Sequence, residues 1–455
     1  DRVKVKTMRK VETEGLAPLD PQENRFENFP KYQRSPRLIK RVPTERIHIE
    51  NPPAKAELSK TSLAQIIITP LIMLCITVAV SILMKRGIYV VVSVATTIVS
   101  MVASVIKYIH DKRDVRERNR KREEIYDEYL LKIRKEIYTA HQAEQEAYTY
   151  NYPPIGQIEN MINECSSRIY ERSAGDEDFL TFAIGHQAEP VSFTIDYTHK
   201  ELAMEDDVLE AEAQEICNRL GTIENKPVVI DLKQAHVGLV GQKDVIHEQL
   251  KLILSQLAFA QSYHELQIIN IYDKKYREDF HWMRWFPHIK IQALNVYGNI
   301  DSERMRDQVL GSLHQIIKER KLRVEESHKE GRFLPHFLFV IDEPRLIMDH
   351  SIMEYLNKEG DNLGFSIIYT SYMRANLPEN IGTVVMLDDS GNGTLLLENK
   401  EVRNLHFKLE HSAGTDYEKM ARNLSMLVHE KGIVSQIPES ITFLLFSMSI
   451  HVLIR

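Results

Sequence analysis

The chain of 455 residues contains little cysteine, and the cysteines are not arranged to hold a metal ion or a disulfide framework. Cys75, Cys165 and Cys217 are far apart in the sequence and form no CxxC pair. The mean hydropathy is negative, at -0.31, which excludes a transporter with many membrane spans. The formal net charge of -7 argues against a protein built mainly to coat nucleic acid. The chain begins at Asp1 without a signal peptide, so we expect a piece of a longer product.

Two long stretches lack charge almost completely. Residues 63–84 contain no charged side chain, and residues 88–109 contain only Lys107. At about 1.5 Å per residue each stretch reaches about 33 Å, enough for the roughly 30 Å hydrocarbon layer of a bilayer. We therefore expect a transmembrane hairpin, although a pair of buried core helices is the competing interpretation.

The flanks of the predicted hairpin are basic. Seven Lys or Arg residues fall within residues 111–122, and the segment before the hairpin is basic as well. A three-residue loop places both flanks on one side of the membrane, and the positive-inside rule makes that side cytoplasmic. We expect a multi-pass membrane protein with both termini in the cytoplasm and with anionic lipid at its basic flanks. A nucleic-acid-binding arm is the alternative.

Composition and periodicity divide the chain into segments. Residues 1–60 are rich in charge and proline and predict a cytoplasmic connector. Residues 61–110 hold the predicted hairpin, residues 111–150 predict a helical stalk, and residues 446–455 form an atypical tail after an α/β domain at 151–445. The stalk carries apolar residues at spacings of four and three, broken at Glu144: Tyr126, Leu130, Ile133, Ile137, Ala140 and Ala147. This seam predicts packing on a neighbouring helix or subunit.

After residue 154 strands and helices alternate, and several strands are continuous apolar runs. This pattern predicts a parallel-rich sheet covered by helices on both faces, as in a P-loop NTPase. The expected strands are 179–184, 191–195, 227–232, 236–240, 266–272, 337–341, 366–370, 383–387 and 394–397. The expected helices are 158–170, 207–220, 245–263, 302–327, 346–357 and 417–428.

One strand–loop–helix segment occupies the place of a phosphate loop. The working pattern is G-x-x-x-x-G-K-[ST], whose amides and lysine hold phosphates and whose hydroxyl holds magnesium. If Gly241 is its first glycine, then Ile246, His247 and Glu248 replace the second glycine, the lysine and the hydroxyl. Lys243 precedes the normal lysine position. We predict a degenerate phosphate loop and no bound nucleotide or other cofactor.

A second segment resembles a Walker B strand, because an apolar run ends in Asp342 and Glu343. Such acids hold magnesium and polarise water, but the pattern is only moderately specific and no catalytic residue can be assigned firmly. Thr370, at the end of the next strand, is either a sensor position or a plain strand end. His281 and His288 flank an aromatic cluster that predicts packing, and we expect no metal site.

Four stretches of sequence carry a resemblance to a known family. They are YQRSPR at 32–37, RIYER at 168–172 with DEDFL at 176–180, WMRWFPH at 282–288 and DEPRLI at 342–347. In this order, around two apolar segments, they resemble the FtsK/SpoIIIE-type membrane ATPases of type VII (ESX-like) secretion, in particular the EssC/YukB branch.

The resemblance implies a RecA/FtsK-like fold and a bacterial cell membrane. It implies a non-hydrolysing module that couples further ATPase domains, which would use ATP and Mg²⁺, to a membrane channel. The implied partners are copies of the chain in a hexamer, other type VII membrane subunits, and small helical secreted substrates bound through downstream domains absent here; nucleic acid is not among them. A membrane-anchored DNA translocase of the same class and a non-enzymatic scaffold remain alternatives.

Overall fold

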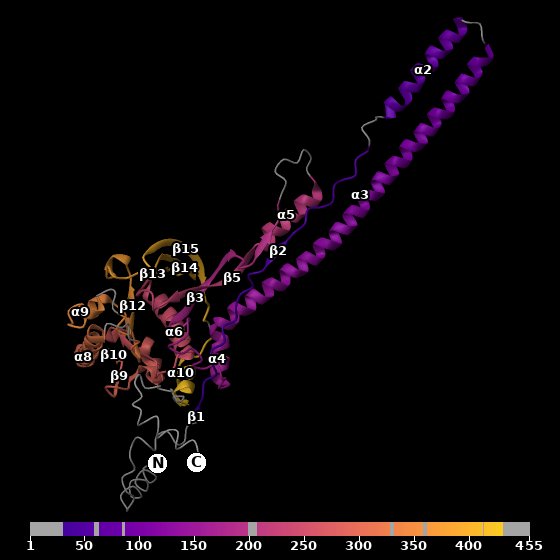
Figure 1. Ribbon diagram of the computed structural model, residues 1–455. Coiled ribbons are helices and arrows are strands. Elements are labelled where there is room, and N and C mark those ends of the chain that lie inside the picture. The colour runs from indigo at the N-terminus through magenta and orange to yellow at the C-terminus, as the bar shows by residue number, and fades with distance from the viewer. Residues whose placement is uncertain are drawn as a thin grey trace, which may run out of the picture. The chain divides into compact units, whose positions relative to one another are not determined.

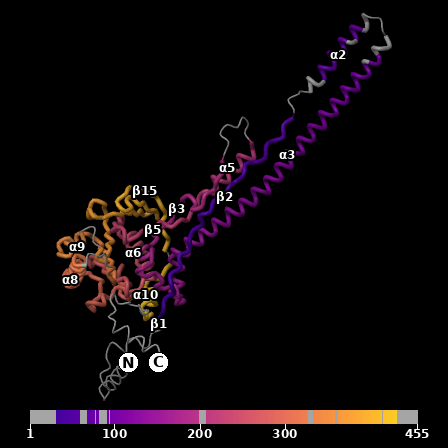
Figure 2. Tube along the Cα trace, viewed as in Figure 1, coloured from indigo at the N-terminus to yellow at the C-terminus, as the bar shows by residue number. Residues whose placement is uncertain are grey.

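The computed structural model describes most of the chain as two compact units. The described residues are 31–58, 63–83, 87–198, 207–327, 332–357, 362–412 and 414–430. Unit 1 contains residues 1–40, 148–188 and 224–455, and unit 2 contains residues 41–147 and 189–223. Figure 1 shows the elements of each unit, and Figure 2 traces the chain through them. The predicted tail at 446–455 and the first half of the predicted connector, residues 1–30, lie outside the described residues.

Unit 1 is built on a ten-stranded mixed sheet with the order β10-β7-β11-β12-β6-β13-β14-β15-β3-β5. Neighbours run parallel from β10 to β13 and antiparallel from β13 to β3. The strands are β3 Thr181–Pro190, β5 Thr222–Asp231, β6 Val237–Val240, β7 Leu266–Ile271, β10 Asn299–Ile300, β11 His336–Ile341, β12 Phe365–Ser371, β13 Thr383–Leu387, β14 Asn392–Glu398 and β15 Glu401–Leu409.

Helices cover both faces of the parallel part of this sheet. In β11, Leu338 and Val340 belong to one buried cluster, while Phe337, Phe339 and Ile341 belong to another. Successive strand residues point to opposite faces, so a strand buried on both faces is apolar throughout. The predicted α/β sheet is therefore confirmed.

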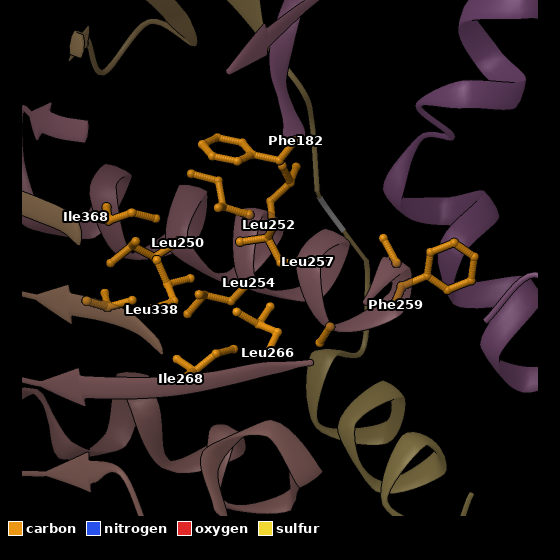
Figure 3. Packing of buried hydrophobic residues seen from close by; sticks show 14 of the residues in the cluster. Phe182, Leu250, Leu252, Leu254, Leu257, Phe259, Leu266, Ile268, Leu338 and Ile368 are labelled. Carbon is orange, nitrogen blue, oxygen red and sulfur yellow. The ribbon is translucent and has the colours of Figure 1, made fainter. Parts of the chain in front are cut away.

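Each of the two clusters is completed by one long helix. Helix α6, Lys243–Ala260, packs Leu250, Leu254 and Leu257 over β11, β12 and β7 (Figure 3). Helix α8, Glu303–Ser327, fills the second cluster with Leu310, Leu313 and Ile317. The other helical segments of unit 1 are α4 Ile155–Asn163, η1 Lys274–Tyr276, α7 Arg277–Phe280, η2 His281–Trp285, η3 Pro287–Ile289, η4 Pro344–Leu346, α9 Met353–Leu356, η5 Arg374–Asn376 and α10 Tyr417–Ser425, and its short strands are β1 Lys31–Tyr32, β8 Lys290–Ile291, β9 Val296–Tyr297 and β16 Val428–His429.

Unit 2 is organised by the apolar seam of a long helix, α3 Gly87–Asn151. The seam residues Tyr126, Leu130, Ile133 and Ile137 are at most 6% exposed. They pack against α5, Val208–Leu220, and against the residues around β2, Arg46–His48, which pairs with β4, Thr194–Asp196. The predicted packing on a neighbouring helix is confirmed, and that helix belongs to the same chain.

The break in the seam at Glu144 also has a structural reason. The Glu144 side chain is fully buried, and its carboxylate accepts a hydrogen bond from the backbone N–H of Ser192 at 3.0 Å. A buried carboxylate requires such donors, so the polar residue interrupts the apolar spacing where the chain segment 189–223 packs against α3. The seam thus ends in a specific polar contact.

The prediction of a multi-pass protein of the bacterial cell membrane with both termini cytoplasmic is wrong. A span requires about 20 predominantly apolar residues in one helix, and no helix among the described residues is long and apolar enough to cross a membrane. Helices do occupy both uncharged stretches, as α2, Leu63–Leu83, and the beginning of α3. Helix α3 continues without interruption from the second uncharged stretch into a highly charged segment.

Candidate functional site

The acidic and loop residues singled out in the sequence gather at one edge of the sheet. Strand β12 lies between β6 and β11, and all three run parallel. Gly241 follows β6, Asp342 follows β11, and Ser371 ends β12. Because parallel strands end at the same edge, these three positions are brought together where α/β proteins commonly bind ligands.

The segment in the place of the phosphate loop is only two residues long. Gly241 and Gln242 follow β6, and α6 begins at Lys243. The Gly241 N–H donates to the carbonyl of Ser371 at 3.1 Å, so this amide does not face a ligand. A Cβ at Gly241 would lie 2.6 Å from the Leu387 carbonyl oxygen, so the glycine is required by close packing against β13. The turn therefore lacks the length to surround a phosphate.

The three replacing residues lie inside α6 rather than in a loop. Ile246 is completely buried and belongs to the core cluster shared with α6 and β11. His247 is 2% exposed, and Glu248 is exposed on the helix surface. A helix at these positions engages its backbone N–H groups in its own hydrogen bonds, as that of Ile246 does with the Gln242 carbonyl at 3.0 Å.

Lys243, the first residue of α6, is bound to the Walker-B-like acids. Its Nζ lies 2.8 Å from Oδ1 of Asp342 and 2.9 Å from Oε1 of Glu343. It also donates to the Asp342 carbonyl and, at 3.1 Å, to the Thr370 hydroxyl oxygen. The Thr370 hydroxyl in turn donates to the Asp342 carbonyl at 2.6 Å. One ammonium group thus joins the ends of β6, β11 and β12.

His247 holds the same carboxylate from the next turn of the helix. Its Nε2 lies 3.0 Å from Oδ1 of Asp342, and its Nδ1 lies 2.9 Å from Oδ2 of Asp279. Each nitrogen of the His247 ring thus faces the carboxylate of a different aspartate. Edge-on contacts with the rings of Tyr276 and Phe280, each at 4.8 Å between centroids, fix the ring between the two acids.

The electrostatics of Asp342 follow from these neighbours. Burial raises the pKa of Asp342, but the hydrogen bond from His247 and the charge of Lys243 outweigh it, so its pKa is lowered overall. The side chain is completely buried, and Oδ2 makes no hydrogen bond with any described residue. The result is an ionised, buried carboxylate whose charge is balanced by groups of the protein itself.

These residues do not fit a bound Mg²⁺-nucleotide. The Lys243 ammonium already occupies the space beside Asp342 and Glu343 where a divalent cation would lie, and like charges repel. The short turn at Gly241 offers no cradle for the phosphates, and Ile246 fills the core where a glycine would allow one. Among the described residues no group of three His, Cys, Asp or Glu side chains is arranged to hold a metal ion.

Sequence reasoning missed two members of this cluster. Asp279, in the short helix α7, has no pattern around it that indicates a role. The sequence pattern indicates only that Lys243 precedes the lysine position of a phosphate loop. In the structure, its place at the start of the helix that follows β6 brings it to the neighbouring strand ends. The aromatic cluster near His288 is a packed core, because Trp282 contacts both Phe286 and Tyr417. His288 is buried within it, which lowers its pKa to about 4.

Curated proteins of secretion systems are similar to nearly the whole chain. It is 32% identical over 425 residues to the ESX secretion system protein YukB of Bacillus subtilis (strain 168). It is 30% identical over 434 residues to the ESX secretion system protein EccC of Geobacillus thermodenitrificans (strain NG80-2), and 33% identical over 421 residues to the type VII secretion system protein EssC of Staphylococcus aureus (strain MSSA476). These matches cover 93%, 95% and 92% of the chain but only 28%, 29% and 28% of the relatives. The chain thus spans less than a third of their length.

No protein-family model matches the chain. Among solved structures, EssC (ATPases 2 and 3) from Geobacillus thermodenitrificans aligns with 62% of this chain and 56% of its own, at a TM-score of 0.39 and 13% identity. The cytoplasmic domain of the Thermomonospora curvata type VII secretion ATPase EccC aligns with 56% of this chain and 32% of its own, at a TM-score of 0.36 and 13% identity. Over about 93% of its length, the chain is homologous to the type VII secretion proteins EssC, YukB and EccC.

Proposed function

We propose that the chain is a non-hydrolysing, nucleotide-free module of a type VII secretion machine. The observation that carries this proposal is the position of the Lys243 ammonium, within hydrogen-bond distance of Asp342, Glu343 and Thr370. In a working site the lysine neutralises phosphate oxygens, and the acids hold magnesium and polarise water. Here the lysine and the acids neutralise each other.

The free-energy balance opposes nucleotide entry. Mg-ATP would have to separate Lys243 from two acids, one of which, Asp342, is completely buried. Removing one partner from a buried ion pair typically costs about 3–5 kcal/mol, because the other charge stays buried. A ligand of micromolar affinity has about 8 kcal/mol of binding free energy, so such a cost would consume a large part of it. The phosphate cradle that would compensate is missing from the two-residue turn.

Calorimetric titration of the full chain with Mg-ATP tests the proposal. We expect no binding at micromolar concentrations, and no release of phosphate in a parallel hydrolysis assay. The Asp342→Asn variant keeps the side-chain shape and removes the charge, while Asp389→Asn removes an exposed charge elsewhere in unit 1. Micromolar affinity in the unaltered chain that survives Asp389→Asn but disappears with Asp342→Asn would overturn the proposal.

The role within the machine rests on the relatives. Because the chain corresponds to only 28% of the length of YukB, we propose that such a module couples the ATPase domains of a longer protein to other secretion subunits. Copies of the same chain and other type VII subunits are the proposed partners, and small helical secreted substrates would bind through the rest of such a protein. Light scattering of the full chain is expected to give the mass of an oligomer; a single-chain mass at all concentrations would contradict self-association.

A further inference from the structure

A small pocket of unit 1 lies at the edge of the sheet opposite to the site described above. It has a volume of about 140 Å³ and is lined by residues at the starts of β11 and β12. His336 begins β11, whereas Asp342 follows the end of that strand, so the two residues lie about 20 Å apart along the strand. The pocket is therefore separate from the groups that exclude a nucleotide.

His336 presents a hydrogen-bond acceptor to this pocket. The residue lines the pocket but is only 8% exposed, and its Nε2 lies 2.9 Å from the hydroxyl oxygen of Ser366. The Ser366 hydroxyl uses its own hydrogen to donate to the Leu232 carbonyl at 2.6 Å. The proton between His336 and Ser366 therefore belongs to Nε2, and Nδ1 of the neutral ring holds a lone pair.

The lone pair on Nδ1 is available to a ligand. Nδ1 makes no hydrogen bond with any described residue, and the fold does not close this atom off from solvent. An edge-on contact with the ring of Phe179, at 6.2 Å between centroids, holds the imidazole in place. Burial and the charge of Arg320 lower the pKa of His336 to about 3. The ring is therefore neutral at neutral pH, and Nδ1 remains an acceptor.

The charged groups that line the pocket are mainly cations. Arg332 and Lys233 line it, and Asp176 is the one carboxylate among the described lining residues. The Arg332 guanidinium is exposed and forms no hydrogen bond or ion pair within the described residues. The Lys233 ammonium has a distant carboxylate partner in Asp231, at 3.9 Å. One oxygen of Asp176 already accepts from the backbone N–H and the hydroxyl of Ser173, at 2.6 and 2.8 Å.

A buried cation lies directly behind the same pocket. Arg320 of α8 is 6% exposed and forms no ion pair within the described part of the chain. Its guanidinium donates only to carbonyl groups, those of Pro335, Leu363 and Gly364. Gly364 lines the pocket, and a Cβ there would lie 2.8 Å from Nη1 of Arg320. A buried charge without a counter-charge is unfavourable, so an anion in the pocket would offset part of that cost.

We propose that this pocket binds a small oxyanion that carries a hydroxyl group, of which hydrogen phosphate is the simplest. The anionic oxygens accept from Arg332 and Lys233, and the hydroxyl donates to Nδ1 of His336. The pocket is smaller than the roughly 300–1,000 Å³ of sites for larger ligands, which suits an anion of a few heavy atoms. Water alone would satisfy Nδ1 but would leave the cations without a counter-charge. Free phosphate and small organic hydroxy acids share this chemistry.

Calorimetric titration of the full chain with two matched pairs of anions, at equal ionic strength, tests this proposal. Phosphate keeps at least one P–OH group at neutral pH, whereas sulfate has a similar shape and no hydroxyl. Glycolate and acetate form the corresponding pair of carboxylates. We expect phosphate, or glycolate if the ligand is an organic acid, to bind at least about tenfold more tightly than its hydroxyl-free partner. Absence of binding by both hydroxyl-bearing anions, or equal binding within the pair that binds, overturns the proposal.

Arg332→Gln shows whether the pocket or the general surface charge attracts the anion. The variant removes an exposed, unpaired cation of the pocket and is expected to weaken binding by about tenfold. Arg304→Gln is the matched control, because Arg304 is also exposed and lies outside the pocket, and it is expected to leave the affinity unchanged. An equal loss in the two variants would assign binding to the general surface charge and overturn the proposal.

His336→Phe separates the hydroxyl contact from a structural role of the histidine. Phenylalanine keeps a ring beside Phe179 but removes the acceptor, so the preference for the hydroxyl-bearing anion is expected to disappear while the weak binding of its hydroxyl-free partner stays unchanged. A folding defect would weaken both anions by the same factor instead, and thermal unfolding identifies such a defect. A preference that persists in the folded variant would show that Nδ1 does not contact the ligand and would overturn the proposal. The Arg332→Gln comparison applies whether or not the phenylalanine variant folds.

Discussion

The two faces at the start of α6 present the same kinds of polar groups in opposite states. On one face, Lys243 and His247 are both paired with Asp342, which is completely buried. On the other face, Asp244 forms no ion pair within the described residues, and Gln249 keeps a buried acceptor without a partner. The charges on the first face are paired inside the fold, whereas the Asp244 carboxylate on the second face is exposed to solvent. Polar groups on neighbouring faces of one helix thus differ in whether their charges are paired within the chain.

The largest effect on stability is expected from placing glycine at position 246, where the phosphate-loop pattern has its second glycine. Ile246→Gly removes a completely buried side chain and places glycine inside a helix. We expect a loss of about 4 kcal/mol in the free energy of unfolding, from the core cavity and the helix propensity together. Chemical denaturation measures this loss, with Val245→Gly, at a half-buried position, as the matched control. A well-folded glycine variant that gains micromolar affinity for Mg-ATP would show that a side chain, rather than the backbone turn, excludes the nucleotide.

The second effect concerns charge pairing on the two faces. Asp342→Ala removes the buried acid that Lys243 and His247 share and is expected to cost about 3 kcal/mol of unfolding free energy, although Glu343 and Asp279 remain as their other acceptors. Asp389→Ala, in the exposed turn between β13 and β14, is expected to change that free energy by no more than about 0.5 kcal/mol. Equal losses in urea denaturation would remove the distinction between the two faces.

The smallest effect separates two carboxylates by the sign of their pH dependence. The pKa of Asp342 is lowered overall, so its contribution to stability is present above the unfolded value of about 3.9 and is lost as the pH falls. Burial raises the pKa of Glu410, against the N–H of Ile155, so its folded state holds a proton to higher pH than the unfolded state. That contribution is present below the unfolded value of about 4.3 and is lost as the pH rises.

Glu410→Gln is therefore expected to be nearly neutral at about pH 4. At neutral pH it is expected to stabilise the chain by about 1 kcal/mol or less, because the uncharged amide still accepts from Ile155. Asp342→Asn is expected to show the opposite trend, with its largest cost at neutral pH. Denaturation curves recorded at both pH values measure the two slopes; slopes of the same sign would contradict the assigned environments.

The sequence predicted the strands of unit 1 well, because each buried strand is a compact apolar run between polar turns. The strand β15 was missed because only Phe407 among its residues is buried, so its sequence carries no apolar run. A helix expected at 346–357 is reduced to a turn that begins at Pro344 and to the four residues of α9. The helix expected at 158–170 ends at Asn163, and Cys165 and Tyr170 have positive φ angles, which no helix accommodates.

For the candidate site, the sequence identified Asp342, Glu343 and His247 but not Asp279, and it did not predict the contacts of any of them. The misfit of Ile246, His247 and Glu248 to a phosphate loop can be read from side-chain chemistry at fixed spacing. The pairing of Lys243 with Asp342 joins residues 99 positions apart, and that of His247 with Asp279 joins residues 32 apart. Such pairings depend on the order of strands in the sheet, and no local pattern records that order.

The most direct test of the pairing of Lys243 with Asp342 and Glu343 is a side-chain-resolution map of the full chain prepared with millimolar Mg-ATP. The account predicts that Lys243 Nζ stays within hydrogen-bond distance of Asp342 and Glu343, with no nucleotide density at the turn formed by Gly241 and Gln242. Triphosphate density against the start of α6, with the Lys243 ammonium turned away from Asp342 toward the phosphates, would contradict it.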